Sequence, residues 1–518
     1  MTDEKKTTTR RVSRRDFVKG AAAGATLLTG AGALAACGTT AAPGAAPGVP
    51  ESWDRETDVV IVGYGGAGAR AAIAASDAGA EVLILEKRSV AGGASAICGG
   101  VIYAGGTSVQ EANEIEDSAD NLYQHYLNAG KGFIDTELAR MAADSARENI
   151  DFLIGLGAEF PNPPSVSGAE FKVGSEPIAR VHRVAYGDLV GGAAFFRVLA
   201  DGAEERGAEV LLETPGKSLV VDGDGQVVGV VAESDGSEIY IKARKAVVLT
   251  AGGFTRSKEM LAAYTKDGYY GQPLGPEGLD GDGHRMALAL GADMMNMWKI
   301  VGIFGVTPPG AVSATYASTG GIVVNLEGKR FVDETSFYDV HSNELLEQDE
   351  GRGFSIFDEA YREAAGGPVI GAFSEDLEEE VSTGLVFKAD TIGALAQQMG
   401  VPADRLEETV ATWNEGVEAG EDGEFGRTAR LAPIDTPPYY AFETYAAVFD
   451  TVGGAKINEK AQVVDVWGDV IPRLYAAGVN TGGLIGEYYP GSGTALNTTI
   501  LTFGRVAGES AAAEEPWG

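Results

Sequence analysis

The pattern of hydrophobic positions first becomes regular between residues 58 and 86. Asp58–Val62 is a short apolar run rich in β-branched residues, which is typical of a buried strand. Ala69–Asp77 has a helical composition, and Gly79 is suited to end that helix. A second apolar run follows and ends at Glu86. The pattern therefore predicts a strand, a helix and a second strand in close succession.

Three glycines occupy the turn between the first strand and the helix with G-x-G-x-x-G spacing: Gly63, Gly65 and Gly68. In such a turn the first glycine allows a tight bend, the second lets the backbone approach a pyrophosphate, and the third lets helix and strand pack closely. The free N–H groups of the helix N-terminus attract the anion, and Glu86 can accept hydrogen bonds from a ribose. Glycine spacing alone is weak evidence in a chain with 73 glycines. The complete strand, turn, helix, strand and acid predict a dinucleotide-binding unit.

Further along the chain, helical and strand-like patterns alternate. Glu111–Gly157 has apolar residues at helical spacing, Glu209–Ile241 alternates like a series of strands, and Ala246–Gly253 is typical of another buried strand. Residues 391–420 predict amphipathic helices, with Leu395, Leu406 and Trp413 on the core face. Pro437–Tyr440 interrupts the pattern, which favours a linker.

These segments predict an α/β fold in which a Rossmann-like cofactor domain is split by an inserted α+β capping and substrate domain. The sequence loses its glycine-rich character after about residue 300 and regains it at Gly453. The predicted ranges are 1–36 for an export signal, 37–56 for a linker, 57–296 for the first part of the cofactor domain, 297–447 for the cap and 448–515 for the second part.

Composition narrows the possible functions. The chain has 518 residues, with 40 Lys and Arg against 75 Asp and Glu, and a net charge of −35. This balance favours a soluble, self-repelling surface and argues against nucleic-acid binding, which needs basic stripes. The cysteines are Cys37 and Cys98, and the four histidines show no metal-ligand spacing. We therefore predict no disulfide framework, no haem attachment and no metal site.

The N-terminus resembles a twin-arginine export signal. Ser13–Lys19 reads S-R-R-D-F-V-K, and a weakly apolar stretch follows to Ala36. Leu34–Cys37 resembles a lipobox, which implies a lipid on Cys37 and a flexible tether up to Pro50. The prediction is export to the cell envelope with membrane attachment through Cys37. Two alternatives remain: cleavage near an A-x-A site, which gives a free extracytoplasmic protein, and a tail without a targeting role.

Four motifs together resemble the FAD-dependent superfamily of fumarate reductase flavoproteins and 3-ketosteroid dehydrogenases. They are GYGGAGARAA (63–72) with Glu86, GKRFVDE (328–334), YAAG with its following TGG (475–483), and FGRVAGE (503–509). The resemblance implies FAD as the cofactor. The positions expected to contact it are Gly63, Gly65, Gly66, Ala67, Gly68, Glu86, Lys87, Gly92, Gly93, Ala94, Ser95, Gly99, Gly100, Ala251, Gly252, Gly478, Thr494, Ala495 and Leu496.

The two branches of this superfamily differ in the charge of their substrate pockets. Fumarate reductases hold a dianion with cations at three positions, and this chain has Phe337, the uncharged or acidic stretch 486–491, and Asp450–Val452 there. Burying a dicarboxylate without cationic partners costs several kcal/mol. The 3-ketosteroid dehydrogenase pattern is closer, because Arg330–Asp339 follows its R-Y-L-N-E-S-x-P-Y-D motif.

That resemblance implies the chemistry. Tyr338 falls at the position of the general base, while the Tyr489 hydroxyl and the Gly493 N–H are expected to hold a ketone oxygen. A phenol has a pKa of about 10 and needs assistance to act as a base. Arg330 and His341 are the candidates for that assistance.

Three functions follow. The first is a flavoenzyme that acts on the C–C bond next to a ketone of an apolar, steroid-like substrate. The second is an exported reductase of enoates or other α,β-unsaturated acceptors, fed by a separate electron carrier such as a quinone or redox protein. The third is a flavin-loaded lipoprotein that only carries electrons or binds a ligand. The sequence leaves the direction of the reaction open.

Overall fold

The computed structural model describes residues 48–265, 272–306, 321–365, 367 and 373–517. The predicted export signal and Cys37 lie outside these residues and stay predictions. Within the described ranges, no helix combines the length and the apolar character that crossing a membrane requires.

A mixed eight-stranded sheet forms the cofactor domain. The strand order β19-β20-β10-β1-β2-β7 has a parallel centre, and β9 and β8 extend from β10 as an antiparallel meander. The strands are β1 (Arg55–Val62), β2 (Val82–Leu85), β7 (Glu209–Leu211), β8 (Gly216–Val221), β9 (Val227–Ser234), β10 (Ser237–Leu249), β19 (Gln462–Val464) and β20 (Val470–Ala476). Because β1 lies between β2 and β10, its apolar residues are buried on both faces, as a continuous hydrophobic run predicts.

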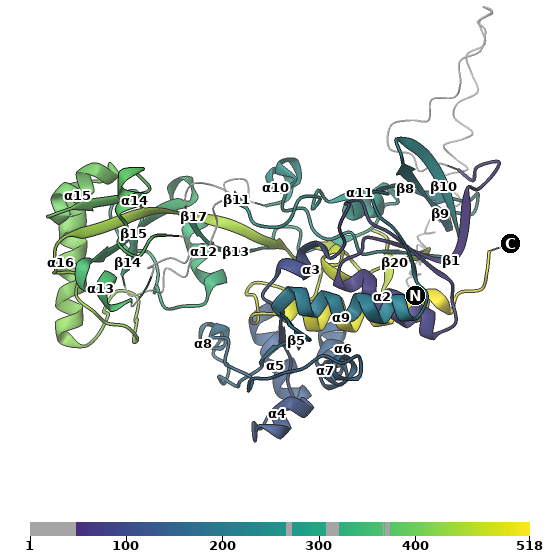
Figure 1. Cartoon of the computed structure of the whole chain (residues 1–518), viewed down its shortest axis with the longest axis horizontal. Coiled ribbons are helices and arrows are strands. Elements are labelled where there is room, and N and C mark those ends of the chain that lie inside the picture. Colours follow the sequence, from purple (N-terminus) through teal and green to yellow (C-terminus); the bar gives the residue numbers. More distant parts are fainter. Residues whose placement is uncertain (1–47, 266–271, 307–320, 366, 368–372, 518) are drawn as a thin grey trace, which may run out of the picture. The chain divides into compact units, whose positions relative to one another are not determined.

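Helices from three distant segments pack together beside this sheet. Figure 1 shows α2 (Gly66–Asp77) beside α9 (Gly191–Glu205), and α2 also contacts α17 (Phe503–Ala512). A π-helix, Leu496–Thr502, leads directly into α17. Glycines allow the close packing: a Cβ on Gly508 would lie 2.2 Å from the Ala71 carbonyl oxygen. The predicted C-terminal return of the chain to the cofactor domain is therefore confirmed.

The predicted helical region 111–157 consists of four helices and forms a layer of the same domain. These are α4 (Ser108–Ala112), α5 (Ala119–Gly130), α6 (Thr136–Asp144) and α7 (Ala146–Gly155). Shorter elements complete this part of the chain: α3 (Gly93–Ile97), β3 (Val101–Tyr103), α8 (Ala169–Val173), β4 (Val181–Arg183), β5 (Ala185–Tyr186), β6 (Leu189–Val190), α10 (Lys258–Tyr264), α11 (Asp282–Ala289), β12 (Met294–Met295), β18 (Gly454–Ala455) and the 3-10 turn Gly478–Asn480.

A second, six-stranded sheet forms the inserted part. Its longest strand is β17 (Tyr439–Thr451), which pairs with four others and is seen in Figure 1 beside α15 and α16. The remaining elements are β11 (Gln272–Pro273), β13 (Ile300–Val306), β14 (Ile322–Val324), α12 (Tyr338–Leu346), the 3-10 turn Asp349–Gly351, β15 (Arg352–Asp358), α13 (Glu359–Ala364), α14 (Glu378–Ser382), β16 (Val386–Ala389), α15 (Ile392–Met399) and α16 (Ala403–Ala419). Leu395, Leu406 and Trp413 are in the core of this part, as predicted.

Two sequence predictions about the elements are wrong. Pro437–Tyr440 was expected to be a linker, but Tyr439 begins β17, because pairing starts only after the two prolines and so needs no donor from them. Ala246–Gly253 was expected to be a separate strand, but residues up to Leu249 continue β10 from Ser237, first beside β9 and then beside β1. The predicted boundary after residue 447 falls inside β17. The other predicted domain boundaries stay predictions.

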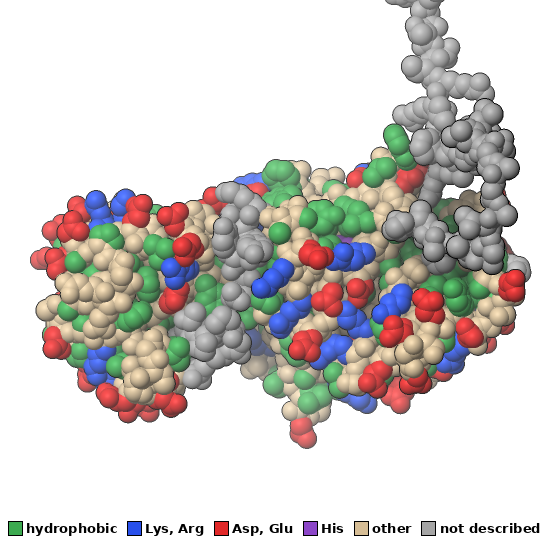
Figure 2. Space-filling view, turned by 90° about the horizontal axis from the view of Figure 1, so that it is seen from above, with side chains coloured by type: hydrophobic (Ala, Val, Ile, Leu, Met, Phe, Trp, Pro, Cys, Tyr) green, Lys and Arg blue, Asp and Glu red, His purple; other side chains and the backbone are tan. Residues whose placement is uncertain are grey.

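The surface carries the excess of acidic residues as a distributed charge. Figure 2 shows Asp and Glu side chains spread over the face in view, with Lys and Arg side chains between them. Many are paired at the surface, as Arg140 is with Asp120 and Asp144. The face in view is therefore highly charged, with acidic and basic side chains interspersed.

Candidate functional site

The turn after β1 is shaped so that only glycine fits at two positions. Gly63 has a φ of +108°, and a Cβ there would lie 2.5 Å from the Thr250 carbonyl oxygen. A Cβ on Gly68 would lie 2.1 Å from the Gly63 carbonyl oxygen, so this glycine lets α2 approach the strand end. The tight turn predicted at Gly63 and the close helix packing predicted at Gly68 are therefore confirmed.

The N-terminus of α2 is open to an anion. Gly65 occupies the N-cap position and has no side chain to accept hydrogen bonds from the first helical turn. The Gly66 N–H donates to Ser95 Oγ at 3.0 Å, which ties the loop after β2 to the helix start. Gly65, Gly66 and Ala67 line a cavity, so their backbones lie where a pyrophosphate is bound in such units.

Glu86 is held rigidly at the end of β2. Its Oε2 accepts from the Tyr64 N–H at 3.0 Å and its Oε1 from the Arg88 N–H at 2.9 Å. The side chain is buried but lines the cavity, and each carboxylate oxygen can accept a further hydrogen bond. The neighbouring Lys87 is paired with Asp280 at 2.8 Å and Asp282 at 2.7 Å, so its charge is largely neutralised. This end of the cavity suits a ribose.

The cavity has a volume of about 330 Å³ and passes from the Glu86 end to Tyr489. Most of the predicted cofactor positions line it: Gly63, Gly65, Gly66, Ala67, Glu86, Lys87, Gly93, Ala94, Ser95, Ala251, Gly252, Gly478, Ala495 and Leu496. The glycine cradle, the open helix start and the fixed carboxylate together fit a dinucleotide.

Five predicted cofactor positions do not line this cavity: Gly68, Gly92, Gly99, Gly100 and Thr494. A Cβ on Gly100 would lie 1.9 Å from the Gly191 carbonyl carbon, and one on Gly92 would lie 2.5 Å from Ala96 Cβ. The Thr494 hydroxyl donates to the Gly491 carbonyl. These residues shape the loops around the cavity rather than its wall. Gly99 is the exception, because a Cβ there would meet no atom within 4 Å.

Of the three predicted catalytic residues, Tyr489 lines the cavity, and Tyr338 and Gly493 do not. Tyr338 and Tyr489 nevertheless belong to one buried cluster, in which their ring centroids are 6.4 Å apart and Phe337 lies against both. The Tyr338 hydroxyl accepts a hydrogen bond from Ser492 Oγ at 3.5 Å. Gly493 has a φ of +91°, and a Cβ there would lie 2.0 Å from the Val101 carbonyl oxygen.

The Tyr489 phenol is a hydrogen-bonding group at the cavity wall. Its oxygen accepts from the Ala495 N–H at 3.3 Å, and its own hydrogen remains to be donated. Burial raises the pKa of Tyr489, and the nearby acids Asp450, Cys98 and Asp339 raise it further. Tyr489 is therefore protonated at neutral pH and can donate to a carbonyl oxygen.

A buried ion pair fixes the segment that carries Tyr489. Asp339, next to Tyr338 on α12, accepts from Lys299 Nζ at 2.9 and 3.0 Å and from the Tyr489 N–H at 3.0 Å. Both charged side chains are buried. Lys299 is the cation that sequence reasoning missed here, and nothing in its local sequence marks it as buried.

Two further cavity residues were not predicted as site residues. Asp450 and Cys98 line the wall near Tyr489. Burial raises the pKa of Cys98, and it raises the pKa of Asp450 to about 7 although the Thr451 N–H donates to that carboxyl. Asp450 belongs to the stretch Asp450–Val452, one of the three places where the resemblance implies a cation in fumarate reductases, and that departure was the available signal.

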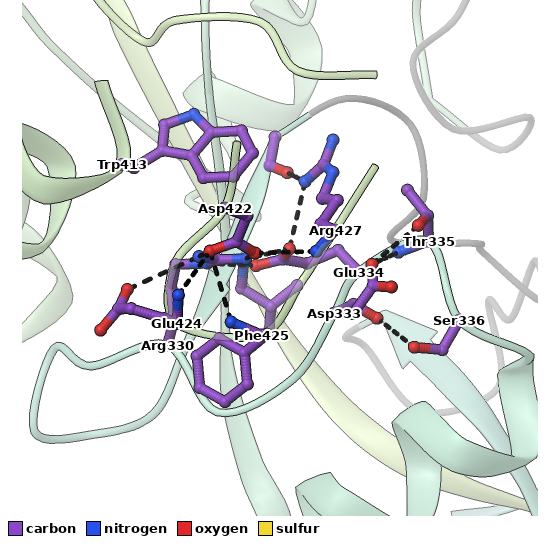
Figure 3. A network of polar contacts seen from close by, with 12 residues as sticks. Arg330, Asp333, Glu334, Thr335, Ser336, Trp413, Asp422, Glu424, Phe425 and Arg427 are labelled. Carbon is purple, nitrogen blue, oxygen red and sulfur yellow. Dashed lines mark hydrogen bonds and ion pairs between the residues drawn. The ribbon is translucent and has the colours of Figure 1, made fainter. Parts of the chain in front are cut away.

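Arg330 and His341 were proposed to assist Tyr338, and their contacts give that hypothesis no support. Figure 3 shows Arg330 in a network with Glu334, Asp422 and Arg427 in the inserted part. Its Nη2 lies 2.8 Å from Glu334 Oε2 and 2.9 Å from Asp422 Oδ2. His341 Nε2 lies 2.9 Å from the Asp333 carbonyl oxygen, and burial lowers the pKa of His341.

The other histidines have structural contacts. His125 Nε2 lies 2.7 Å from the Pro490 carbonyl oxygen and so supports the loop that follows Tyr489. His284 Nε2 lies 2.9 Å from the Gly453 carbonyl oxygen, and burial lowers the pKa of His284 to about 4. His182 contacts Thr107 and the Arg180 carbonyl.

Comparison with known proteins decides the family. A family model described as an FAD binding domain matches residues 58–496. The chain belongs to this family. A fumarate reductase (cytochrome) from Shewanella frigidimarina is 32% identical over 457 residues, which are 88% of this chain and 77% of that protein.

Solved structures of this FAD-binding family agree with the fold. A 3-ketosteroid-Δ4-(5α)-dehydrogenase from Rhodococcus jostii RHA1, in complex with 4-androstene-3,17-dione, has a TM-score of 0.75 and 30% identity, covering 90% of this chain and 100% of its own. A 3-ketosteroid Δ1-dehydrogenase from Sterolibacterium denitrificans has a TM-score of 0.81 and 25% identity, covering 89% and 100%. The predicted fold class and superfamily are confirmed, the cofactor is FAD, and the protein is an FAD-dependent oxidoreductase.

Proposed function

We propose that this flavoenzyme exchanges two hydrogens across the C–C bond next to a ketone of an uncharged, apolar, steroid-like substrate. The observation that carries the proposal is the chemistry of the cavity wall at the Tyr489 end, where we place the substrate beside the reacting end of the bound FAD. The polar side chains there are a phenol, a thiol and a carboxyl, beside Leu274, Phe449 and Leu496. Among the described lining residues, the cations are Lys87 and Arg88, which adjoin Glu86 at the other end.

The absence of a facing cation among these residues disfavours a dicarboxylate. Each buried carboxylate without a partner costs several kcal/mol, and a neutral ketone has no such cost. Lys299 does not change this balance, because its charge is already neutralised by Asp339. The ligand of the Rhodococcus jostii dehydrogenase, 4-androstene-3,17-dione, is a neutral ketone and supports the proposal by analogy.

In the proposed mechanism, Tyr489 and the Gly493 N–H donate hydrogen bonds to the ketone oxygen. Donors placed on a developing enolate oxygen stabilise the transition state by a few kcal/mol. Tyr338 takes the proton from the carbon next to the carbonyl, or returns it when the reaction runs as a reduction. FAD, when bound, supplies the hydride exchange at the second carbon. The aromatic cluster of Phe337, Tyr338 and Tyr489 excludes water from that step.

A second candidate function is a reductase of α,β-unsaturated acceptors fed by a separate electron carrier. The fumarate reductase from Shewanella frigidimarina supports it, because its similarity extends over 88% of this chain. For both functions we propose a separate redox partner, either a quinone or a redox protein. We also propose that the protein is exported and carries a lipid on Cys37.

A substrate panel with purified holoprotein tests the proposal. Neutral ketones and enones are offered with an electron-accepting dye in air, and enoates are offered with reduced viologen without oxygen. Turnover of 4-androstene-3,17-dione or a related ketone is expected, with loss of turnover in Tyr489→Phe and Tyr338→Phe. Turnover of fumarate alone would contradict the ketone proposal and favour the second candidate. Full activity in both tyrosine variants would contradict the proposed mechanism.

A further inference from the structure

Asp450 is the acidic side chain at the Tyr489 end of the cavity. It lies near the end of β17, opposite Val301 on β13, and its side chain keeps some surface open because it faces the cavity. Its Oδ1 accepts one hydrogen bond from the Thr451 N–H at 2.9 Å. Gly253, from the loop after β10, packs closely against this strand end: a Cβ there would lie 2.3 Å from Thr451 Oγ1 and 3.4 Å from Asp450 Oδ1.

The surroundings of this carboxyl disfavour its ionised form. The titratable groups that face it are Cys98, on the segment after α3, and Tyr489, on the C-terminal loop, and both are acids. Lys299, a buried cation directly before β13, is paired with Asp339 instead. Burial raises the pKa of Asp450 to about 7. A ligand that fills the cavity removes further water from the carboxyl and favours its neutral form more strongly.

A protonated carboxyl and an ionised one select opposite ligands. The protonated form is a hydrogen-bond donor that suits a neutral carbonyl oxygen, and it imposes no charge repulsion. The ionised form accepts only and repels carboxylates that enter the same cavity. Below its titration midpoint, the Asp450 carboxyl can therefore donate a hydrogen bond to a ketone. Above the midpoint, its negative charge repels anionic ligands.

We propose that Asp450 is the substrate-selecting residue of this cavity: its carboxyl carries a proton in the working enzyme, donates a hydrogen bond to a neutral substrate oxygen, and excludes anionic substrates when ionised. This inference rests on the proposed function for the class of substrate. It adds to the two phenols and the glycine N–H a carboxyl on the cavity wall, which donates when protonated and only accepts when ionised.

The first test asks whether Asp450 holds the proton, without any substrate. Infrared difference spectra of the FAD-loaded protein are recorded between pH 5 and pH 9. The C=O stretching band of a protonated carboxyl is expected to disappear with a midpoint at or above about pH 7. Asp450→Asn should lack this transition. Asp465→Asn, which changes a carboxyl that hydrogen-bonds the turn N–H groups of Trp467 and Asp469, should retain it.

The inference is overturned if wild type shows no carboxyl transition above pH 6, or if the transition persists in Asp450→Asn. Flavin content and thermal unfolding of each variant show that it is folded and loaded. Asn keeps the size and a donor of the protonated side chain, so we expect both variants to fold.

The second test measures ligand binding through the change in flavin absorbance, one pH unit below and one above the infrared midpoint. The protonated fraction falls about tenfold over this interval. The affinity of wild type for 4-androstene-3,17-dione should fall by the same factor, and that of Asp450→Asn should not change. Wild type should bind fumarate more weakly than Asp450→Asn at the higher pH.

These outcomes separate the two proposals. Equal steroid affinity at both pH values in wild type contradicts the selecting role of Asp450 and leaves the proposed function standing. If no variant binds the steroid at either pH, the substrate class of the proposed function fails, and the infrared transition and the fumarate comparison still decide the assignment of Asp450. Equal fumarate affinity in wild type and Asp450→Asn at the higher pH also overturns the selecting role of Asp450.

Discussion

The Asp339 carboxylate accepts a hydrogen bond from the backbone N–H of Tyr489 at 3.0 Å, across 150 residues of sequence. The same Oδ2 atom receives Lys299 Nζ at 2.9 Å. Three segments therefore meet at one carboxylate: the start of α12, the chain before β13 and the C-terminal loop. Because Tyr338 precedes Asp339, this contact also sets the spacing of the two phenols.

We predict that Asp339→Asn destabilises the protein by about 3–5 kcal/mol, because it leaves the Lys299 ammonium buried without a counter-charge. Thermal and denaturant unfolding measure this loss. The double variant Asp339→Asn with Lys299→Met should recover part of it, since both buried charges are then removed. Equal stability of the single variant and wild type would show that the pair is unimportant.

Glu327→Gln provides the matched control for that experiment. Glu327 forms an exposed ion pair with Lys329 at 2.7 Å, and exposed pairs contribute little to stability. No measurable change in unfolding is expected. A loss similar to that in Asp339→Asn would indicate that burial of the pair is not the cause.

We predict that Tyr489→Phe lowers turnover of a ketone substrate about 10²–10³-fold, because it removes one donor to the developing oxyanion. The flavin content should stay near wild type, and the melting temperature should fall only modestly, because the buried Ala495 N–H loses its acceptor. Steady-state kinetics and flavin absorbance measure these quantities. Tyr240→Phe, on β10 and away from the cavity wall, should leave turnover unchanged.

We predict that Gly63→Ala abolishes FAD loading. The methyl group would lie 2.5 Å from a backbone oxygen of Thr250, at a φ of +108° that disfavours alanine. Gly99→Ala is the control, because a Cβ at Gly99 meets no atom within 4 Å. The ratio of flavin to protein after purification measures both variants. Loss of FAD in Gly99→Ala would instead restore the prediction that Gly99 contacts the cofactor.

The network in Figure 3 predicts a pH dependence of stability. Burial alone raises the pKa of Asp422, but the hydrogen bonds and charge of Arg330 outweigh it and lower the pKa to about 2. A carboxyl with a depressed folded-state pKa stabilises the protein above its unfolded value of about 3.9, and this stabilisation is lost as the pH falls through the folded value.

Asp422→Asn should therefore be less stable than wild type at pH 7, and the difference should shrink between pH 4 and pH 2. Chemical unfolding at several pH values measures it. A difference that stays constant over this range would show that ionisation of Asp422 does not contribute.

Local order along the chain explains which parts of the fold could be predicted. The strand, turn and helix around Gly63 depend on neighbours in sequence, and the helices of residues 391–420 on spacing along one face, so both could be recognised. β10 was divided in two because its first half pairs antiparallel with β9 and its second half parallel with β1. No local pattern records that change of partner.

The sequence by itself determined the dinucleotide-binding unit, because its strand, turn, helix and acid are contiguous. The return of glycine-rich segments at Gly453 indicated the split of the cofactor domain, and the motif resemblance supplied Tyr489 as a candidate. Only the tertiary structure decided that Asp450 and Cys98 share the cavity wall with Tyr489 and that Lys299 is neutralised by Asp339. These facts depend on distances between segments that are remote in sequence. Burial and charge pairing, which set the chemistry of each group, arise only when the chain brings those segments together.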